Sequence, residues 1–367
     1  MYFPDPAGGV QEVIKQLASC TIPHGVESRI FTLSPAPQPK YITYNDTSVI
    51  RSKSWLAPAS CDLGGLDSLS TFKTMVDWCD IVHYHFPWPF ADVLHFLGGV
   101  RKPYIVTYHS DIVRQKLMGF LYGPLMKKFL SSAETVVASS PIYAQTSKVL
   151  LKNVSPSRLF VIPLGVADYS NIDIGFDIEQ SILRKFDLEG KKFVLSLGAL
   201  RYYKGLHTLV EAALDITALV VIAGSGPEVD NLKRQVASLN LNNIIFTGHI
   251  SEDEKITLLR HCSVFALPSH LRSEAFGMVL VEASMFGKPL VCCEIKSGPT
   301  FININGETGL TVPPENPKAL AIAVETLLDE GQEKLYGSAA RKRYETHFSG
   351  ESLGAAYGAL YKKILGN

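Results

Sequence analysis

The stretch 193–213 reads FVLSLGALRYYKGLHTLVEAA and contains the structural unit from which the rest of the chain is built. It starts with an apolar run, turns at Gly198, and continues into a helix-like segment at 206–213. The apolar run does not alternate with polar residues. Such a run is typical of a strand that is buried on both faces, as in a parallel sheet covered by helices.

The same unit recurs along the chain. Apolar runs that we expect to be strands lie at 28–34, 80–86, 102–109, 134–139, 159–164, 193–198, 218–224, 243–248, 263–268 and 289–294. Helix signals lie between them. Ser251 and Glu254 form a capping-box pattern, and a helix is expected over 274–286, where Gly287 would end it. The alternation of strands and helices predicts an α/β doubly wound architecture.

A change of composition suggests where the chain divides. Residues 166–180 are acidic and rich in Asn and Asp, without strong periodicity. The sequence therefore predicts two Rossmann-like domains, over 1–168 and 169–348. The segment 349–367 is expected to be a C-terminal helix that returns to the first domain.

Composition excludes several classes of protein. Of 367 residues, 35 are Lys or Arg and 35 are Asp or Glu, so the formal net charge is zero. This balance disfavours a nucleic-acid binder, and 46% hydrophobic residues disfavour disorder. No apolar run approaches the ~20 residues that a membrane-spanning helix needs. Six cysteines without a C-x-x-C pair, and a start without a signal-peptide pattern, predict a cytoplasmic protein with free thiols.

The strongest local signal is the stretch 273–282, SEAFGMVLVE, in which Glu274 and Glu282 stand eight positions apart. We expect Gly277 in the first turn of a helix, where free backbone N–H groups favour an anion. Glu282 would lie in an apolar helix, and a carboxylate buried there needs a partner. Sugar hydroxyls fit that need. A Lys or Arg of the neighbouring domain fits it as well.

A second signal is the basic loop after the strand at 193–198. Arg201 and Lys204 leave the strand just before a helix starts, and ligands of open α/β sheets bind at that edge. Two cations there can neutralise a diphosphate leaving group. An ordinary solvated loop would look the same.

Glycine pairs give weaker signals. Gly224 and Gly226 follow an apolar strand, but Val229 occupies the place of the third glycine in a G-x-G-x-x-G motif. Gly8 and Gly9 precede a predicted helix and would allow a phosphate or sugar to approach closely. Tight turns explain both pairs equally well.

Histidines mark the end of one strand in the first half. His109 and Asp111 stand at the C-terminal end of the run 102–109, a place that favours a functional role. His83 and His85 alternate on another strand, so one side of the sheet could carry both. We rank them below His109.

With these residues identified, the chain resembles the family 4 retaining glycosyltransferases, which have the two-domain glycosyltransferase B fold. The resemblance covers nearly the whole chain. It is carried by Gly8-Gly9-Val10, by Tyr108-His109-Ser110-Asp111, by Arg201 with Lys204-Gly205, by Gly224-Ser225-Gly226-Pro227, and by the pair Glu274 and Glu282. The stretches 88–92, 107–115 and 200–205 look most like bacterial enzymes that add mannose or rhamnose to lipopolysaccharide or exopolysaccharide chains.

The resemblance implies roles for individual residues. His109, Arg201, Lys204 and Glu274 would be catalytic, with Lys204 on the donor diphosphate, Glu274 on hydroxyls of the transferred sugar and His109 near its C6 hydroxyl. The remaining donor-binding residues would be Gly9 beneath the diphosphate, Gly226, Ile250 facing the base, the backbone amides of Phe276, Gly277 and Met278, and Glu282 on the ribose hydroxyls.

Two positions depart from the family pattern. Many members carry an Arg directly after the first Gly of the phosphate motif, where this chain has Ala199. Arg201 would replace it. Members also begin with a strand before the Gly-Gly loop, whereas only seven residues precede Gly8 here. Either the central strand of the first sheet is missing or the true start lies upstream.

The resemblance predicts a transferase that moves a hexose to a growing, lipid-linked bacterial surface polysaccharide such as O-antigen, with retention. The expected donor is a GDP-sugar carrying mannose or rhamnose, although a UDP-sugar also fits. The sequence has no D-x-D motif, so we expect neither metal nor cofactor. Segment 114–130 is basic and rich in Leu, Met and Phe, which suits peripheral contact with the inner membrane or core packing.

Other functions fit parts of the pattern. A nucleotide-sugar 2-epimerase can share the fold and would need no acceptor. A non-catalytic nucleotide-sugar-binding protein fits the absent first strand. An NAD-dependent oxidoreductase is disfavoured by the incomplete glycine fingerprint.

Overall fold

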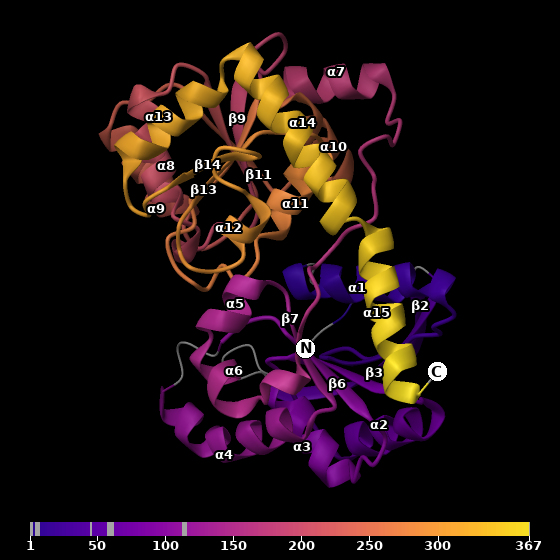
Figure 1. Cartoon of the computed structure of the whole chain (residues 1–367). Helices are drawn as coiled ribbons and strands as arrows, with labels where there is room; N and C mark the ends of the chain where they lie inside the picture. Colours follow the sequence, from indigo (N-terminus) through magenta and orange to yellow (C-terminus); the bar gives the residue numbers. More distant parts are fainter. Residues whose placement is uncertain (1–2, 4–7, 45, 57–61, 112–115, 367) are drawn as a thin grey trace. The chain divides into compact units, whose positions relative to one another are not determined.

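The computed structural model describes residues 3, 8–44, 46–56, 62–111 and 116–366, and of residues 116–121 only the backbone. The chain divides into two compact units (Figure 1). The first comprises Met1–Ala167 and Gly350–Asn367, and the second comprises Asp168–Ser349.

The second unit is built on one parallel six-stranded sheet in the order β11-β10-β9-β12-β13-β14. Its strands are β9 (Phe193–Leu197), β10 (Leu219–Ala223), β11 (Ile244–Gly248), β12 (Val264–Leu267), β13 (Leu290–Cys293) and β14 (Gly309–Val312). The apolar side chains of the inner strands are buried, as expected for strands covered on both faces. Two central strands, β9 and β12, lie side by side, so the loops that follow them leave the same edge of the sheet.

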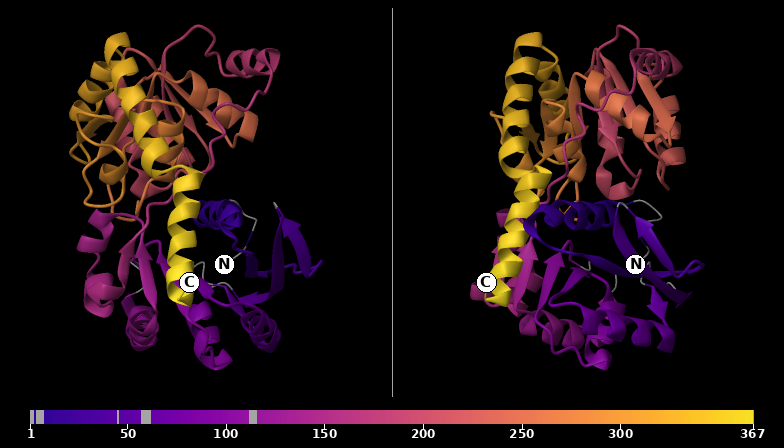
Figure 2. Two further views of the ribbon diagram at one scale, coloured as in Figure 1. Left: turned by 45° about the vertical axis from the view of Figure 1, so that its right-hand side comes forward. Right: turned by 90° about the vertical axis from the view of Figure 1, so that its right-hand side faces the viewer.

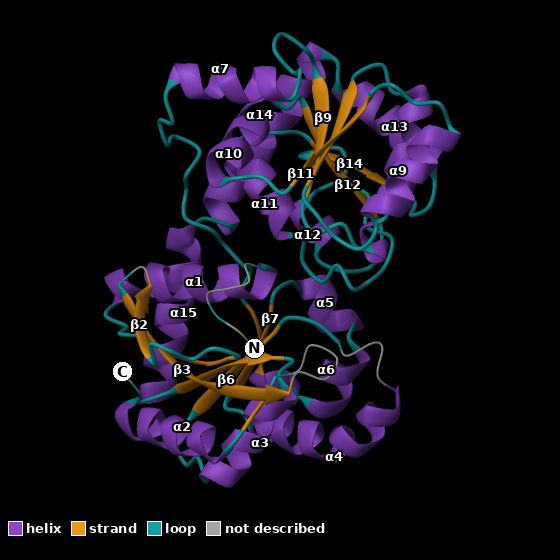
Figure 3. Ribbon diagram, turned by 180° about the vertical axis from the view of Figure 1, so that it is seen from behind, coloured by secondary structure: helices purple, strands orange, loops and turns teal. Residues whose placement is uncertain are grey.

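Helices cover this sheet on both faces (Figure 3). They are α7 (Phe176–Lys185), α8 (Leu206–Ala212), α9 (Val229–Ser238), α10 (Glu252–His261), α11 (Met278–Met285), α12 (Pro299–Ile302), α13 (Pro317–Leu327) and α14 (Glu330–His347). The predicted capping box is confirmed, because Ser251 Oγ accepts from the Glu254 amide at 3.2 Å and Glu254 Oε2 accepts from the Ser251 amide at 2.7 Å.

The first unit carries two sheets. One is parallel, with the order β5-β6-β7-β8, and the other has the order β1-β3-β2 with β4 paired to β3. The strands are β1 (Arg29–Ser34), β2 (Tyr41–Tyr44), β3 (Thr47–Leu56), β4 (Leu63–Gly64), β5 (Val82–Phe86), β6 (Tyr104–Tyr108), β7 (Thr135–Ala138) and β8 (Leu159–Val161). Because β1 pairs with β3 in parallel while β2 and β4 run antiparallel to β3, this second sheet is mixed.

Seven α-helices of the described chain belong to the first unit. They are α1 (Gly9–Thr21), α2 (Leu66–Trp78), α3 (Pro89–Gly98), α4 (Lys116–Ser132), α5 (Pro141–Thr146), α6 (Lys148–Asn153) and α15 (Gly350–Leu365). Helix α15 packs against the C-terminal end of α1 and crosses it, as both views of Figure 2 show. The contact is close: a Cβ at Gly354 would come within 2.0 Å of the carbonyl oxygen of Cys20. Leu353 and Tyr357 join Leu17 and Ile105 in one hydrophobic cluster.

The fold class expected from the sequence is confirmed, but some element bounds differ. The helix expected over 274–286 begins only at Met278, because Gly277 adopts a left-handed φ of 97° and interrupts the helical backbone before it. Strands β2, β3, β4 and β14 were not predicted. In the described part of the chain, no helix is long and apolar enough to cross a membrane.

Candidate active site

Two loops of the second unit meet at the edge of its sheet, one after β9 and one after β12. Gly205 has a φ of 67°, and a Cβ there would come within 2.0 Å of the carbonyl oxygen of Pro268. The amide of His270 donates to the carbonyl oxygen of Tyr203 at 3.1 Å. The loops therefore touch backbone to backbone, and Gly205 is required by both its conformation and its close contact.

This contact brings Lys204 and Glu274 together. Lys204 Nζ lies 2.5 Å from Glu274 Oε2, and the two side chains are only 12% and 10% exposed. Burial disfavours the charged ammonium, but the carboxylate of Glu274 outweighs it, so the pKa of Lys204 lies above its ordinary value. Ser269 Oγ also donates to Glu274 Oε2 at 3.2 Å. The pair thus places a permanent cation beside a carboxylate that is oriented by a hydroxyl.

Arg201 lies on the same loop but on its exposed side. Its backbone precedes the short 3-10 helix Tyr202–Lys204, and its side chain is exposed to solvent. The sequence singled out both cations, and the structure places Lys204 beside Glu274 and leaves Arg201 in solvent. A solvent-exposed guanidinium near the loop can still reach an approaching anion.

The N-terminus of α11 lies four residues after Glu274. Phe276 is buried, Gly277 is the N-cap residue, and Met278 is the first residue of the helix. A Cβ at Gly298 would come within 2.4 Å of the Phe276 Cα, and the Gly298 amide donates to the Ala275 carbonyl at 3.0 Å. These contacts fix the segment whose first amides form the positive end of the helix, a suitable site for phosphate oxygens.

Glu282 lies farther along α11 and is paired within the same unit. Its Oε1 accepts from the Tyr169 hydroxyl at 2.7 Å and lies 3.3 Å from Lys255 Nζ. Burial disfavours the charged form of Lys255, but the nearby carboxylates, Glu282 first among them, outweigh this effect. The pKa of Lys255 therefore lies above its ordinary value. The partner is therefore not a residue of the neighbouring domain, as one sequence interpretation held, but a lysine of α10.

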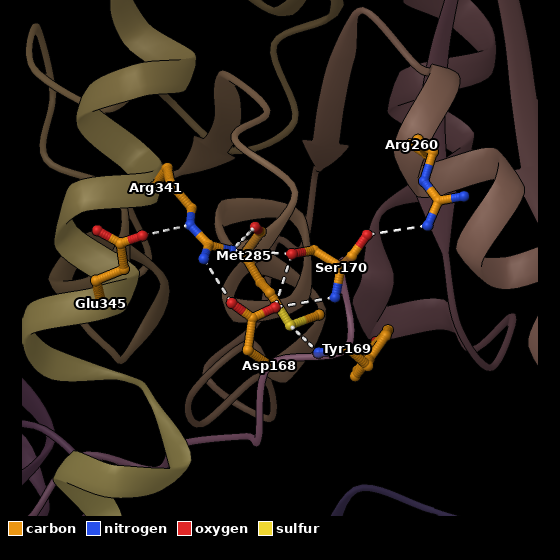
Figure 4. A network of polar contacts seen from close by, with 7 residues as sticks. All are labelled: Asp168, Tyr169, Ser170, Arg260, Met285, Arg341 and Glu345. Atoms are coloured by element: carbon orange, nitrogen blue, oxygen red, sulfur yellow. Dashed lines mark hydrogen bonds and ion pairs between the residues drawn. The ribbon is translucent and has the colours of Figure 1, made fainter. Parts of the chain in front are cut away.

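A polar network holds Tyr169 in place (Figure 4). Arg341 binds the carboxylate of Asp168 at 2.5 Å and the hydroxyl of Ser170 at 3.1 Å. Arg260 donates to the carbonyl of Ser170 at 2.9 Å, and the Tyr169 amide contacts Met285 Sδ at 3.4 Å. Because both neighbours of Tyr169 are tied to helices of this unit, its hydroxyl is held at Glu282.

The remaining donor-binding candidates of the second unit lie at the same edge of the sheet. Gly226 packs against the loop after β9, since a Cβ there would come within 2.6 Å of the Leu200 amide nitrogen. The Leu200 amide donates to the Ser225 carbonyl at 2.9 Å, so this glycine pair supports the loop that carries Lys204. Ile250 is half-buried and follows β11, immediately before the cap of α10.

His109 lies in the first unit, directly after β6. Its Nε2 lies 2.9 Å from Nδ1 of His85, and their rings stack at 5.2 Å. His83 stacks on His85 at 4.8 Å, which confirms that one side of the sheet carries both. Burial lowers the pKa of His109 to about 4, so its imidazole is neutral at pH 7.

Asp111 and Gly9 differ from His109 in their surroundings. The Asp111 carboxylate accepts from the hydroxyls of Tyr108 at 2.9 Å and Ser147 at 2.6 Å, so it holds the loop together. Gly9 is exposed at the start of α1, and a Cβ there would meet nothing within 4 Å. The fold itself therefore does not require a glycine at position 9.

Sequence reasoning missed three residues that contact the candidate carboxylates. They are Ser269 at Glu274, and Tyr169 and Lys255 at Glu282. Ser269 could have been noticed, because it stands directly after the strand that leads to Glu274. Neither Tyr169 nor Lys255 lies in a recognisable motif.

Comparison with known proteins identifies the family to which the chain belongs. The sequence profile described as Glycosyltransferase Family 4 matches residues 7–168, and that described as Glycosyl transferases group 1 matches residues 179–343. The chain is 39% identical over 365 residues to O-antigen chain mannosyltransferase C of Escherichia coli, covering 99% of this chain and 96% of the relative. It is also 39% identical over 349 residues to D-rhamnosyltransferase WbpZ of Pseudomonas aeruginosa, covering 95% and 90%.

Solved structures show the same fold. Sucrose-phosphate synthase of Thermosynechococcus elongatus superimposes with a TM-score of 0.78 at 22% identity, over 98% of this chain and 94% of that one. HepE of Anabaena, in complex with UDP and glucose, gives 0.78 at 17% identity over 98% of each chain. Together with the identity to both relatives over nearly the whole length, these matches show that the chain belongs to the family 4 glycosyltransferases and has the glycosyltransferase B fold.

Proposed function

We propose that this glycosyltransferase moves mannose or rhamnose from a GDP-sugar to a growing surface polysaccharide of a bacterium, with retention of the anomeric configuration. The observation that carries the proposal is the 39% identity, over at least 95% of the chain, to one relative named a mannosyltransferase of the O-antigen and another named a D-rhamnosyltransferase. Because the HepE structure contains UDP, a UDP-sugar remains the alternative donor for the experiment to distinguish.

The second unit supports the donor side of this reaction. Lys204 would neutralise the diphosphate, and the first amides of α11 would bind its distal phosphate. Glu274, which Ser269 and Lys204 orient, would accept hydrogen bonds from hydroxyls of the transferred sugar. When the donor binds, the Glu282 carboxylate would give up its hydrogen bond from Tyr169 or Lys255 and accept hydrogen bonds from the ribose hydroxyls instead.

The proposed step is a front-face substitution that needs no metal. The bond between the anomeric carbon and the leaving phosphate oxygen breaks, and the acceptor oxygen attacks the same face. The departing phosphate takes the proton of the acceptor hydroxyl, so charge and atoms balance. Positive charge that develops on the sugar would be stabilised by nearby dipoles, for which neutral His109 is the proposed group. Full transferase activity after a chelator has removed metal ions would support a reaction that needs no metal.

A lipid-linked acceptor at the cytoplasmic face of the inner membrane is part of the proposal. In the described half of α4, Lys127 and Lys128 are exposed, whereas Phe129 and Leu130 are buried. The basic side chains are thus available to anionic headgroups, but these two apolar side chains belong to the core. Arg114 and Gln115, in the predicted contact segment, lie outside the described residues.

Ligand-induced stabilisation tests the donor class. A ligand at about 100 times its dissociation constant stabilises the native state by about 2.7 kcal/mol, so thermal melts with GDP, UDP and ADP should single out GDP. GDP-mannose and GDP-rhamnose are then incubated with a lipid-linked saccharide, and NMR of the product reports its anomeric configuration. Stabilisation by UDP alone would exclude the GDP-sugar, and an inverted product would exclude retention.

A further inference from the structure

Three histidines form a row on one face of the parallel sheet of the first unit. His83 and His85 alternate on β5, and His109 directly follows β6. The strand register pairs His85 with Thr107, so the two strands present these side chains on the same face. Only His109 has a role in the proposed function. The two imidazoles beside it have none so far.

His85 and His109 are held edge to edge. Nδ1 of His85 lies 2.9 Å from Nε2 of His109, and the two ring planes are inclined by only 12°. The backbone amide of His109 also donates to the carbonyl oxygen of Phe86 at 2.9 Å. The backbone and one ring nitrogen of His109 are therefore attached to β5. No described residue forms a hydrogen bond with its other ring nitrogen, Nδ1.

His83 holds the ring of His85 in place. Its Nδ1 lies 2.7 Å from the Tyr361 hydroxyl of α15, and its Nε2 lies 2.7 Å from Thr107 Oγ1, which in turn lies 2.8 Å from the Tyr357 hydroxyl. Because the Tyr357 hydroxyl has no other partner among the described residues, it donates to Thr107, whose own hydroxyl donates to His83 Nε2. The proton of His83 is then on Nδ1 and is donated to Tyr361. With both nitrogens bonded, the His83 ring is a fixed surface on which His85 packs at 4.8 Å.

All three imidazoles are neutral at pH 7. Burial lowers the pKa of His83 to about 3 and that of His109 to about 4, and burial and the two neighbouring imidazoles also lower the pKa of His85. In a neutral ring one nitrogen carries the proton and the other accepts, so a hydrogen bond to one nitrogen determines the state of the other. The contact between His85 and His109 therefore couples the tautomers of the two rings.

Either ring can donate across this contact, and the chemistry at Nδ1 of His109 selects one arrangement. Positive charge develops on the transferred sugar in the proposed reaction, and a bare ring nitrogen presents the negative end of its dipole to that charge. We propose that His85 is a positioning residue, which accepts the Nε2–H of His109 and thereby keeps Nδ1 of His109 unprotonated for the sugar. The inference rests on the proposed function for the action of His109, whereas the hydrogen bond can be tested without any substrate.

Nitrogen NMR of the full chain with isotope-labelled histidine tests the hydrogen bond. At pH 7 His109 should show a single tautomer with its proton on Nε2, and a coupling across the hydrogen bond should join that nitrogen to Nδ1 of His85. His85→Phe keeps a planar ring on His83 but offers no acceptor, so His109 should exchange between both tautomers. His85→Asn places an amide oxygen near the position of Nδ1 and should restore the single tautomer.

Steady-state kinetics connects the tautomer to the reaction. His85→Phe should lower kcat about tenfold and leave KM for the donor unchanged, because an interaction with developing charge acts in the transition state. His85→Asn should recover most of kcat, which a loss of packing alone does not predict. Tyr336→Phe, at a half-buried tyrosine of α14 in the second unit, is the control and should alter neither the tautomer nor kcat.

Two results would overturn the positioning role whatever the kinetics. One is a proton on Nδ1 of His109 in the unsubstituted chain, and the other is the same single tautomer in His85→Phe. A changed tautomer with unchanged kcat would instead refute the action of His109 on the sugar, and with it the catalytic part of the inference. If His85→Phe does not fold, the tautomer and the coupling in the unsubstituted chain decide alone. A chain that transfers no sugar from either GDP-sugar would refute the proposed function, and the spectra would still decide on the hydrogen bond.

Discussion

The two units contain the same strand-and-helix repeat but differ in the continuity of their sheets. In the second unit six strands pair without interruption, and loops after neighbouring strands touch backbone to backbone at Gly205 and Gly226. In the first unit a cavity separates β1 from β5, the strand of His83 and His85, and within the described residues β5 pairs with β6 alone. The continuous sheet of the second unit thus brings together the loops at the ends of its strands, where ligands of such sheets bind.

The largest effect is expected at the ion pair that the continuous sheet assembles. Lys204→Ala should lower kcat/KM about 10²–10³-fold, because the buried cation that we propose to face the leaving group would act mainly in the transition state. Steady-state kinetics with the donor identified by thermal shift measures this. Lys191→Ala, which removes an exposed ion pair with Asp187, is the control and should leave kcat/KM unchanged. Near wild-type kinetics in Lys204→Ala would refute the role of Lys204.

The close contact between loops can be broken by a single methyl group. Gly205→Ala should lower the free energy of unfolding by about 3 kcal/mol, because it combines an unfavourable φ with a clash at Pro268. Gly190→Ala is the matched control, since Gly190 has a similar φ of 68° and open space around it. Gly190→Ala should lower the free energy of unfolding by only about 1 kcal/mol. Equal losses in urea unfolding would mean that the loops do not pack as tightly as we infer.

Acid should weaken the first unit through its histidines. Burial lowers the pKa of His109 to about 4, whereas the unfolded chain takes up that proton near 6.5. The unfolded state therefore binds more protons between these values, and stability falls by up to about 1.4 kcal/mol per pH unit as pH drops from 6.5 to 4. Hydrogen exchange of β6 amides at pH 7 and pH 5 measures the loss. His109→Gln should reduce it, and an identical loss in the variant would contradict this assignment.

The smallest effect tests the open position at the start of α1. Gly9→Ala meets no neighbour and should preserve the fold, with stability unchanged or raised by up to about 1 kcal/mol. If a diphosphate passes over Gly9, kcat/KM should fall about tenfold, or about 1.4 kcal/mol. Gly123→Ala, another substitution into open space and inside α4, should raise stability by a similar amount and leave kcat/KM unchanged. Full activity of Gly9→Ala would remove Gly9 from the donor site.

The sequence predicts some strands and misses others for a physical reason. Strands such as β10 and β12 are buried on both faces, so they appear as uninterrupted apolar runs. Strand β3 is longer but has several exposed residues and pairs antiparallel to β2, so its polar sequence resembles a loop. Strand β14 has four residues and contains Gly309, whose Cβ would come within 1.9 Å of the Leu290 carbonyl. Because close packing requires a glycine at this position, the strand lacks the run of apolar residues from which the other strands are predicted.

The candidate site shows the same division. Lys204 and Glu274 could each be found, because each stands between a strand and a helix. Their pairing could not, since 70 residues separate them and only the adjacency of β9 and β12 brings them together. The partners of Glu282 lie 27 and 113 residues away, on a helix and on the segment entering the second unit. A local sequence pattern cannot predict these contacts, because they form only when strands distant in the sequence lie side by side in the folded sheet.

Helix α15 has a consequence for the order in which the protein can fold. It is synthesised after the second unit, yet Leu353, Tyr357 and Leu360 belong to the core of the first unit. During synthesis, the first unit lacks this helix until the whole second unit has been made, so Leu17 and Ile105 lack their α15 partners until then. The second unit, Asp168–Ser349, is continuous in sequence and needs no later segment. The unit that is made first is therefore completed only after the second, and its apolar core is exposed for longer during synthesis.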